Sequence, residues 1–370
     1  MANILDYLDW RGDLQISERG FNEVDNLLLA ELCYLDFGGI VPPGFDAPVP
    51  LQEAMRRYDV LREHESMGVL VPDQIPELGR RMAASARFSG LLLCGYENKI
   101  DDETQTQFSA LTLLLPDGTA YVAFRGTDDT IVGWKEDFNL AFLPVVPAQR
   151  MAVQYLQAAA EVFSERPLRV GGHSKGGNLA VYAGAFCSEA AQQRIELVYN
   201  FDGPGFDRKI LDQAGYEAIC PRVRTFVPQS SVVGMLLGHE EQYTVVHSQE
   251  TGLTQHNIYT WDVERESLSY LDTVTHGSRF IDRTLKDWLA GMSVEQRAVL
   301  VDTVYEVMQQ TGARTVPELK ANWFGSTRAM IRAAGALNED DRRSVMRMLR
   351  LLMQSAIGEL SGADKETSKA

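Results

Sequence analysis

Residues 172–176, Gly-His-Ser-Lys-Gly, restrict the possible folds of this chain more than any other stretch does. They match the pattern G-x-S-x-G, follow the apolar run 168–170 and precede a run of small residues at 179–185. A serine in this pattern sits on a sharp turn between a strand and a helix, where flanking glycines leave room for crowded backbone. The pattern predicts that Ser174 is a nucleophile, and the helix that follows would favour a developing oxyanion.

The five-residue pattern is not specific by itself. A glycine-rich turn between a strand and a helix can also bind phosphate, or can be merely structural. Lys175 does not belong to a G-x-x-x-x-G-K-S/T pattern, which argues against a phosphate site. Because a strand precedes the motif and a helix follows it, as a nucleophile elbow requires, we favour the nucleophile.

Composition limits the class of protein. The chain has 370 residues, 45% of them hydrophobic, which is enough for one large domain or two. Its formal net charge of −16 argues against binding nucleic acid or anionic lipid. Four widely separated cysteines, without a C-x-x-C pair, predict buried thiols rather than disulfides or a zinc site. The N-terminus does not resemble a signal peptide, and no apolar run of about 18 residues occurs, so we expect a cytoplasmic protein without stable membrane insertion.

Hydrophobic periodicity predicts a helical lead-in over residues 19–37, 51–67 and 76–87. The mainly apolar face of the first of these helices includes Leu27, Leu28, Glu31 and Leu32. Strands are expected at 91–96, 110–115 and 119–124, and a Pro-Asp-Gly turn joins the last two into a hairpin. A helix over 147–165 then leads to the strand and helix of the motif.

Strands and helices continue to alternate after the motif. Strands are expected at 195–201, 223–227, 243–247, 257–263 and 268–271, and a short helix at 206–215. This alternation predicts an α/β fold with a mostly parallel sheet covered by helices. From about residue 276 only helical periodicity remains. We therefore expect a domain over residues 1–290 that includes the lead-in, a C-terminal helical extension over 291–360 and a disordered tail over 361–370.

A serine nucleophile needs a general base, an orienting group and an oxyanion hole. Chains with such an elbow place the acid and then the histidine after the nucleophile. The histidines after Ser174 are His239, His247, His256 and His276. His64 precedes the serine, and His173 is adjacent to it and should point elsewhere. His256, in a polar loop late in the chain, is our candidate base, and His247 is the alternative.

An oxyanion hole requires two backbone N–H groups. Lys175, directly after the serine, is expected to supply one, and Thr127, in the loop after the strand 119–124, the other. The Thr127 hydroxyl is a candidate third donor. Arg125 is expected to be structural and to brace this loop by pairing with Asp137 or Glu136.

Four segments together support a family resemblance. They are residues 3–10 (NILDYLDW), 124–128 (FRGTD), 172–178 (GHSKGGN) and 256–261 (HNIYTW). In combination they resemble the Mbeg1-like family of α/β-hydrolases, which is related to the class 3 lipases, over about residues 3–290. The resemblance implies an α/β-hydrolase fold and lipase-like or esterase-like chemistry. It also implies that Ser174 is the nucleophile, His256 the base and Thr127 an oxyanion donor.

The acid is where this chain departs from the class 3 lipases, which place it in a G-D-x-V type turn. The corresponding residues 227–234 (VPQSSVVG) contain no carboxylate. Asp202, which follows the strand 195–201 and precedes Gly-Pro, is our candidate for orienting His256. The alternative is that Asp202 caps a turn while Ser230 or Ser231 orients His256, which would stabilise the imidazolium less well.

Two functional hypotheses follow. The first is a serine hydrolase of carboxylic esters, acting on acyl or lipid-like substrates without a metal or organic cofactor. It uses a triad of Ser174, His256 and Asp202, and the N–H groups of Thr127 and Lys175 as the oxyanion hole. In this case the apolar run 232–237 would line an acyl groove or form a lid, or else be a buried helix. The second is a catalytically inactive binding or scaffolding protein on a hydrolase fold, which the missing acid at the usual turn favours.

Overall fold

The structure, a computed structural model, describes residues 2–62, 67, 71–128, 130–140, 143, 145–231, 233–274, 301–303, 305, 306 and 343. Nearly all of the expected helical extension, and the whole of the expected tail, lie outside the described residues. The division into domains therefore stays a prediction.

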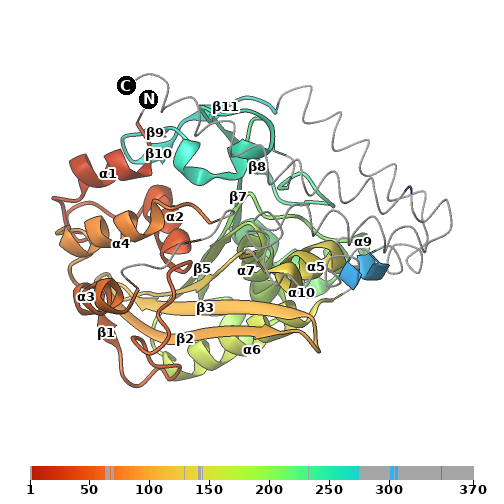
Figure 1. Cartoon of the computed structure of the whole chain (residues 1–370), viewed down its shortest axis with the longest axis horizontal. Helices are drawn as coiled ribbons and strands as arrows, with labels where there is room; N and C mark the ends of the chain where they lie inside the picture. Colours follow the sequence, from red (N-terminus) through yellow and green to blue (C-terminus); the bar gives the residue numbers. More distant parts are fainter. Residues whose placement is uncertain are drawn as a thin grey trace, which may run out of the picture.

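A nine-stranded sheet forms the centre of the described part of the molecule (Figure 1). In spatial order its strands are β1 (Val49–Pro50), β2 (Leu92–Asp101), β3 (Thr106–Leu114), β4 (Ala120–Phe124), β5 (Leu168–His173), β6 (Ile195–Phe201), β7 (Val223–Pro228), β8 (Tyr243–Val246) and β11 (Tyr270–Leu271). The strands β4 to β8 run parallel to one another, and the strands outside them pair antiparallel. The predicted α/β-hydrolase fold with its mostly parallel sheet is confirmed.

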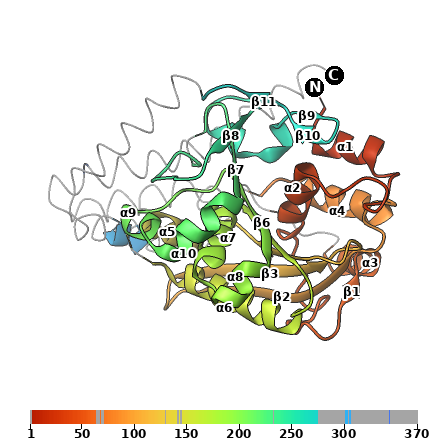
Figure 2. The ribbon, with the colours of Figure 1, turned by 180° about the vertical axis from the view of Figure 1, so that it is seen from behind.

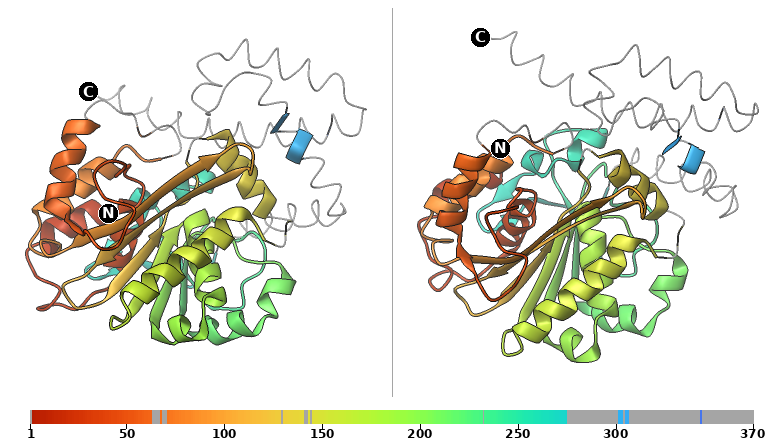
Figure 3. Two further views of the ribbon diagram at one scale, coloured as in Figure 1. Left: turned by 90° about the horizontal axis from the view of Figure 1, so that it is seen from below. Right: turned by 60° about the horizontal axis from the view of Figure 1, so that its bottom comes forward.

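Helices cover both faces of this sheet (Figure 3). One face carries α1 (Ile4–Arg11), α2 (Glu23–Leu32), α3 (Leu51–Leu61) and α4 (Ile75–Ala84), and the other carries α6 (Pro147–Val162), α7 (Lys175–Phe186) and α10 (Ala214–Ile219). Side chains of β4 alternate between the two layers: Tyr121 and Ala123 join the first cluster, whereas Val122 and Phe124 join the second. Both layers are therefore built from apolar side chains of the same strands.

Shorter elements complete the described chain. They are α5 (Ile131–Leu140), α8 (Glu189–Arg194), α9 (Arg208–Leu211), the 3-10 helices η1 (Cys220–Arg222), η2 (Gly252–His256) and η3 (Ile258–Thr260), and the hairpin β9 (Val263–Glu264) and β10 (Ser267–Leu268). This hairpin lies beside α1 (Figure 2), and the N–H of Val263 donates to the carbonyl of Ala2. In the parts of the chain that the structure describes, no helix has both the length and the apolar character needed to span a bilayer.

One local prediction is wrong, and one of the alternatives left open is excluded. The strand expected at 257–263 is mainly the 3-10 helix η3, and only its last residue enters β9. Ile258 and Trp261 are fully buried there, so their apolar character reflects packing rather than strand pairing. Within the run 232–237, the described residues 233–237 form turns and bends rather than a buried helix.

A buried ion pair fastens α2 to the segment that precedes β2. Arg87 Nε lies 2.6 Å from Asp25 Oδ1, and both side chains are fully buried. Asp25 also completes the capping box with Asn22 that begins α2. Arg87 donates further hydrogen bonds to the carbonyls of Arg19 and Gly20. The pair thus joins the start of α2 to the segment before β2.

We expect Arg87→Met to lower the free energy of unfolding by about 3–5 kcal/mol, because the Asp25 carboxylate would remain buried without a cation. Arg80→Met is the matched control, since Arg80 meets Asp59 in an exposed pair with an N–O distance of 2.9 Å. Its loss should cost about 1 kcal/mol or less. Urea unfolding curves would measure both changes, and equal losses would contradict the fastening role.

Candidate active site

Ser174 occupies the turn between β5 and α7. Its φ of 58° and ψ of −133° lie outside the regions that residues with a side chain ordinarily adopt. Its N–H donates to the carbonyl of Phe201 at 2.9 Å, which holds the turn against the neighbouring strand β6. The structure therefore has the sharp strand-to-helix turn that the motif predicts.

Gly172 and Gly176 permit this turn because neither position has room for a side chain. A Cβ on Gly172 would lie 2.4 Å from the carbonyl oxygen of Gly176, and one on Gly176 would lie 2.1 Å from the carbonyl oxygen of Phe124. These neighbours are backbone atoms, which cannot rotate away as a side chain can. The spacing of the two glycines thus follows from the close approach of β4, β5 and α7.

Three side chains from separate parts of the chain meet at this turn. His256 Nε2 lies 2.8 Å from Ser174 Oγ, and His256 Nδ1 lies 2.6 Å from Asp202 Oδ2. Ser174 follows β5, Asp202 follows the adjacent parallel strand β6, and His256 ends η2. In this geometry a carboxylate can fix the imidazole so that Nε2 faces the serine hydroxyl, as a general base requires.

Asp202 is 1% exposed, and its other oxygen is also engaged. Oδ1 accepts hydrogen bonds from the hydroxyl of Ser231 and from the N–H of Gly234. Ser231 therefore contacts the carboxylate rather than the imidazole, and the N–H of Ser230 donates to Gln255. Of the two partners that the sequence left open for His256, the structure places Asp202 against the ring.

His239 supports the loop that contacts Asp202. Its Nε2 lies 2.8 Å from the carbonyl oxygen of Gly234, and its Nδ1 lies 2.9 Å from Glu241 Oε1. Burial would raise the pKa of Glu241, but hydrogen bonds from His239, Tyr216 and Thr225 lower it to about 2. An ionised Glu241 thus holds His239 in place against this loop.

The two expected oxyanion donors flank Ser174. Lys175 is the first residue of α7, where backbone N–H groups have no partner inside the helix. Thr127 follows Gly126, at which an added Cβ would come within 3.1 Å of the Cβ of Ser174. The Thr127 hydroxyl donates to Asp137 Oδ2 at 2.5 Å, so its single proton is engaged, contrary to the expected third donor.

The side chain of Lys175 is a structural feature that the sequence did not reveal. It is 1% exposed, and Nζ lies 2.9 Å from the carbonyl oxygen of Gln107 and 3.0 Å from Glu136 Oε2. Glu136 in turn accepts hydrogen bonds from the N–H groups of Gln107 and Ala148. This buried pair ties α5 and β3 to the first turn of α7, and so to the residue beside Ser174.

The pairing expected for Arg125 is wrong. Its guanidinium donates to Asp128 and Asn98, because the ammonium of Lys175 lies against Glu136 and 4.0 Å from Asp137. Burial raises the pKa of Asp137 to about 6, with the Lys175 ammonium and the Thr127 hydroxyl acting in the opposite direction. Arg125 still braces the Thr127 loop, but through a different carboxylate.

The remaining histidines lie in different surroundings. His247 Nδ1 pairs with Asp262 Oδ2 at 2.6 Å, which leaves His256 as the histidine that contacts Ser174 among the described residues. His64 and His276 lie outside the described residues. The ring of His173 lies tilted against that of His256 with centroids 4.6 Å apart, and its other side faces Glu31. The only sequence feature that pointed to the contact between His173 and Glu31 was Glu31 itself, a carboxylate on the mainly apolar face of the first expected helix.

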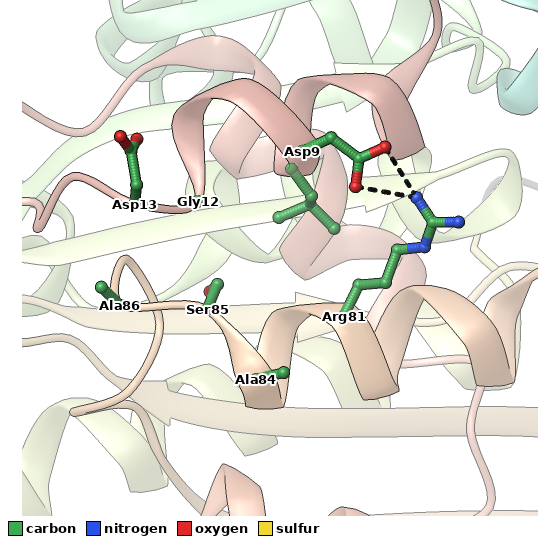
Figure 4. A pocket seen from close by; sticks show the side chains of 8 residues that line it. Asp9, Gly12, Asp13, Arg81, Ala84, Ser85 and Ala86 are labelled. Atoms are coloured by element: carbon green, nitrogen blue, oxygen red, sulfur yellow. Dashed lines mark hydrogen bonds and ion pairs between the residues drawn. The ribbon is translucent and has the colours of Figure 1, made fainter.

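A surface hollow of about 380 Å³ lies away from this site, between α1 and α4 (Figure 4). It is lined by Leu8, Asp9, Gly12, Asp13, Arg81, Ala84, Ser85 and Ala86. Arg81 Nη1 contacts both oxygens of Asp9 there, at 3.0 and 3.1 Å. None of the lining residues belongs to the Ser174 site. Within the described residues, no cluster of histidine, cysteine and carboxylate side chains is suited to hold a metal ion.

The matched family agrees with the resemblance seen in the motifs. Residues 82–306 match the family described as Mbeg1-like. The chain belongs to the Mbeg1-like family. The matched span contains Ser174, Asp202 and His256, whereas α1 and α2 of this Mbeg1-like protein precede it. Among curated proteins, none matches the sequence.

Solved structures similar to this Mbeg1-like protein include fungal lipases. Lipase II from Rhizopus niveus is 10% identical, over 80% of this chain and 94% of its own, with a TM-score of 0.39. The native propeptide complex of Rhizomucor miehei lipase is 16% identical, over 56% of this chain and 68% of its own, with a TM-score of 0.35. At these identities and TM-scores the likeness does not indicate an activity for this chain.

Proposed function

We propose that this Mbeg1-like protein is a serine hydrolase of carboxylic esters. The observation that supports it most is the pair of contacts at His256: Nε2 to Ser174 Oγ at 2.8 Å and Nδ1 to Asp202 Oδ2 at 2.6 Å. A serine, a base and a carboxylate joined in this order are the arrangement that activates a hydroxyl for attack on a carbonyl. The strained turn that exposes Ser174 supports the same role.

In the first half of the reaction Ser174 Oγ bonds to the carbonyl carbon of the ester while His256 takes the serine proton. The electron pair of the carbonyl bond moves to its oxygen, which the N–H groups of Lys175 and Thr127 stabilise. The intermediate then collapses, the bond to the alkoxy oxygen breaks, and the leaving alcohol receives the proton from His256. Asp202 holds the tautomer and stabilises the imidazolium throughout.

In the second half a water molecule replaces the alcohol. His256 accepts a proton from the water, whose oxygen bonds to the acyl carbon and again forms an oxyanion. Collapse breaks the bond to Ser174 Oγ, which recovers its proton from His256. The products are a carboxylic acid and an alcohol, and none of these steps requires a metal or an organic cofactor.

Acyl or lipid-like esters are the proposed substrates. The segment between β7 and β8 carries the half-buried apolar side chains of Val233, Met235, Leu236 and Leu237. This segment includes Gly234, whose N–H contacts Asp202, so an apolar surface lies next to the acid of the site. Such a surface favours an acyl chain over a charged substrate. The cytoplasmic location and the absence of a nucleic-acid partner stay predictions.

A fluorophosphonate probe and a series of p-nitrophenyl esters test this function. We expect the probe to label Ser174, and hydrolysis to depend on acyl length. Absence of labelling in folded protein would favour the alternative of a binding or scaffolding protein on a hydrolase fold. Mass spectrometry of the labelled peptide identifies the serine.

Asp202→Asn should lower kcat/KM for p-nitrophenyl butyrate by about 10⁴-fold, because an amide favours the wrong tautomer and cannot stabilise imidazolium. Ser231→Ala is the matched control. It removes one hydrogen bond to Asp202 but keeps the carboxylate, so we expect a loss of about tenfold or less. Initial rates at saturating and at low substrate concentration give kcat and kcat/KM for both variants. An Asp202→Asn protein that keeps a tenth of the wild-type rate would remove Asp202 from this role.

A further inference from the structure

His173 contacts the candidate base through both its ring and a hydrogen bond. Its ring centroid lies 4.6 Å from that of His256, with the planes inclined by 35°. Its Nε2 lies 2.9 Å from the main-chain carbonyl oxygen of His256. The residue before the nucleophile thus holds both the ring and the backbone of the base.

These contacts indicate which ring nitrogens of His173 carry a hydrogen. A carbonyl oxygen can only accept, so Nε2 must carry a hydrogen. Nδ1 lies 3.1 Å from Glu31 Oε1, and Glu31 is 1% exposed on α2. Nδ1 also lies 3.4 Å from the hydroxyl of Tyr34, which can donate to a bare nitrogen. A protonated Nδ1 instead places a positive charge 3.1 Å from the buried Glu31 carboxylate, whose oxygens have no hydrogen-bond partner among the described residues. Protonation at both nitrogens gives the carbonyl a donor and the buried carboxylate a cation.

The groups around this pair favour the same state. Burial would lower the pKa of His173, but the contact with Glu31, the charge of Asp202 and the carbonyl of His256 together raise it above its ordinary value. Tyr34, 3.4 Å from Nδ1, and Tyr259, near Glu31, stay neutral because burial raises the pKa of each well above its ordinary value. The other groups on this side are Cys33, whose pKa burial raises to about 12, and the cation of Arg125.

We propose that His173 and Glu31 form a positioning pair for the base: His173, protonated on both nitrogens, forms an ion pair with Glu31 and donates to the His256 carbonyl, and so fixes His256 between Ser174 and Asp202. The proposal rests on the proposed hydrolase function for its kinetic consequences. His173 is a positioning residue, since it reaches the reacting atoms only through His256. The pair also joins the helical lead-in to the site, because Glu31 lies on α2.

Because His173 and Glu31 are charged in this proposal, replacing them should change the pKa of His256, which a role in packing alone would not do. A cation whose ring lies against that of His256 disfavours a second positive charge there. His173→Gln removes this cation and leaves the Glu31 carboxylate uncompensated, and both effects raise the pKa of His256. Glutamine keeps an N–H that can donate to the His256 carbonyl. In the double variant Glu31→Gln/His173→Gln both charges are gone, so the pKa of His256 should return part of the way.

The experiment titrates the histidine rings of the full-length protein by NMR and measures kcat and KM for p-nitrophenyl butyrate. His173→Gln should raise the pKa of His256 by about one unit, and shift the acidic limb of the kcat/KM profile to higher pH by the same amount. His173→Leu, which lacks the donor, should lower kcat by about 10- to 100-fold with KM within about threefold of wild type. His173→Gln should recover most of that loss at alkaline pH.

His247→Gln is the matched control, because His247 forms a similar pair with Asp262 at 2.6 Å but does not contact His256. It should leave both the His256 titration and kcat unchanged. An unchanged His256 pKa in His173→Gln would overturn the proposal. This test does not depend on whether His173→Leu folds. Failure of wild-type protein to react with ester or fluorophosphonate would overturn the hydrolase function instead, while the His256 titration would still report on the pair.

Discussion

Ser174→Ala should lower kcat for ester hydrolysis by about a million-fold, which is the cost typical of losing a serine nucleophile. The fold should be unaffected, since the Ser174 side chain makes no capping bond to α7. The N–H of residue 174 would still donate to the carbonyl of Phe201, because alanine keeps that donor. Single-turnover rates with p-nitrophenyl butyrate, together with a thermal melt, measure the two effects separately.

Ser188→Ala is the control for this change. Ser188 begins α8 and its hydroxyl accepts from the N–H of Ala191, so the variant should lose about 1 kcal/mol of stability and no activity. A Ser174→Ala protein that works within about tenfold of wild type would show that another residue attacks the substrate.

His256→Ala should be nearly as damaging, and the double variant with Ser174→Ala should be little worse than either single change. The two residues act as one unit, so removing the second costs almost nothing once the first is gone. Wild-type activity should also fall as the pH is lowered, because an imidazole that has bound a proton cannot accept the one from Ser174. Rates across a pH series for the wild type and the three variants measure both statements.

The comparison with His247→Ala makes this prediction specific. His247 follows Ser174 in the chain, as His256 does, but it pairs with Asp262. We expect His247→Ala to stay near the wild-type rate. A large loss in His247→Ala combined with a mild one in His256→Ala would reverse the assignment of the base.

The sheet and the serine turn were predictable from the sequence because local rules govern both. Alternating apolar strands and helices indicate a mostly parallel sheet, and two glycines around a serine indicate a turn without room for side chains. Asp202 was accessible by similar reasoning, since it ends a strand next to the one that precedes Ser174. The carboxyl ends of parallel strands meet at one edge of a sheet, so position alone brought the two residues together.

The parts that the sequence did not reveal depend on contacts between distant residues. The Lys175 ammonium lies against Glu136, which displaces Arg125 to Asp128, and no spacing in the sequence indicates which cation meets which carboxylate. Residues 257–263 carry strand-like apolar residues, but Ile258 in the 3-10 helix η3 and Trp261 directly after it fill the core. In such cases tertiary packing overrides the intrinsic preference of these residues for strands.

The position of α2 sets a limit on how far this chain can be trimmed. The family match begins at residue 82, yet α2 lies before it, covers one face of the sheet and carries both Asp25 and Glu31. A protein shortened to start at residue 82 would expose apolar side chains of β2, β3, β4, β6 and β7 to water, and Arg87 would lose its carboxylate. Such a protein should aggregate, as light scattering of the purified fragment would show. The unit that can be moved intact into another protein is therefore larger than the segment by which the family is recognised.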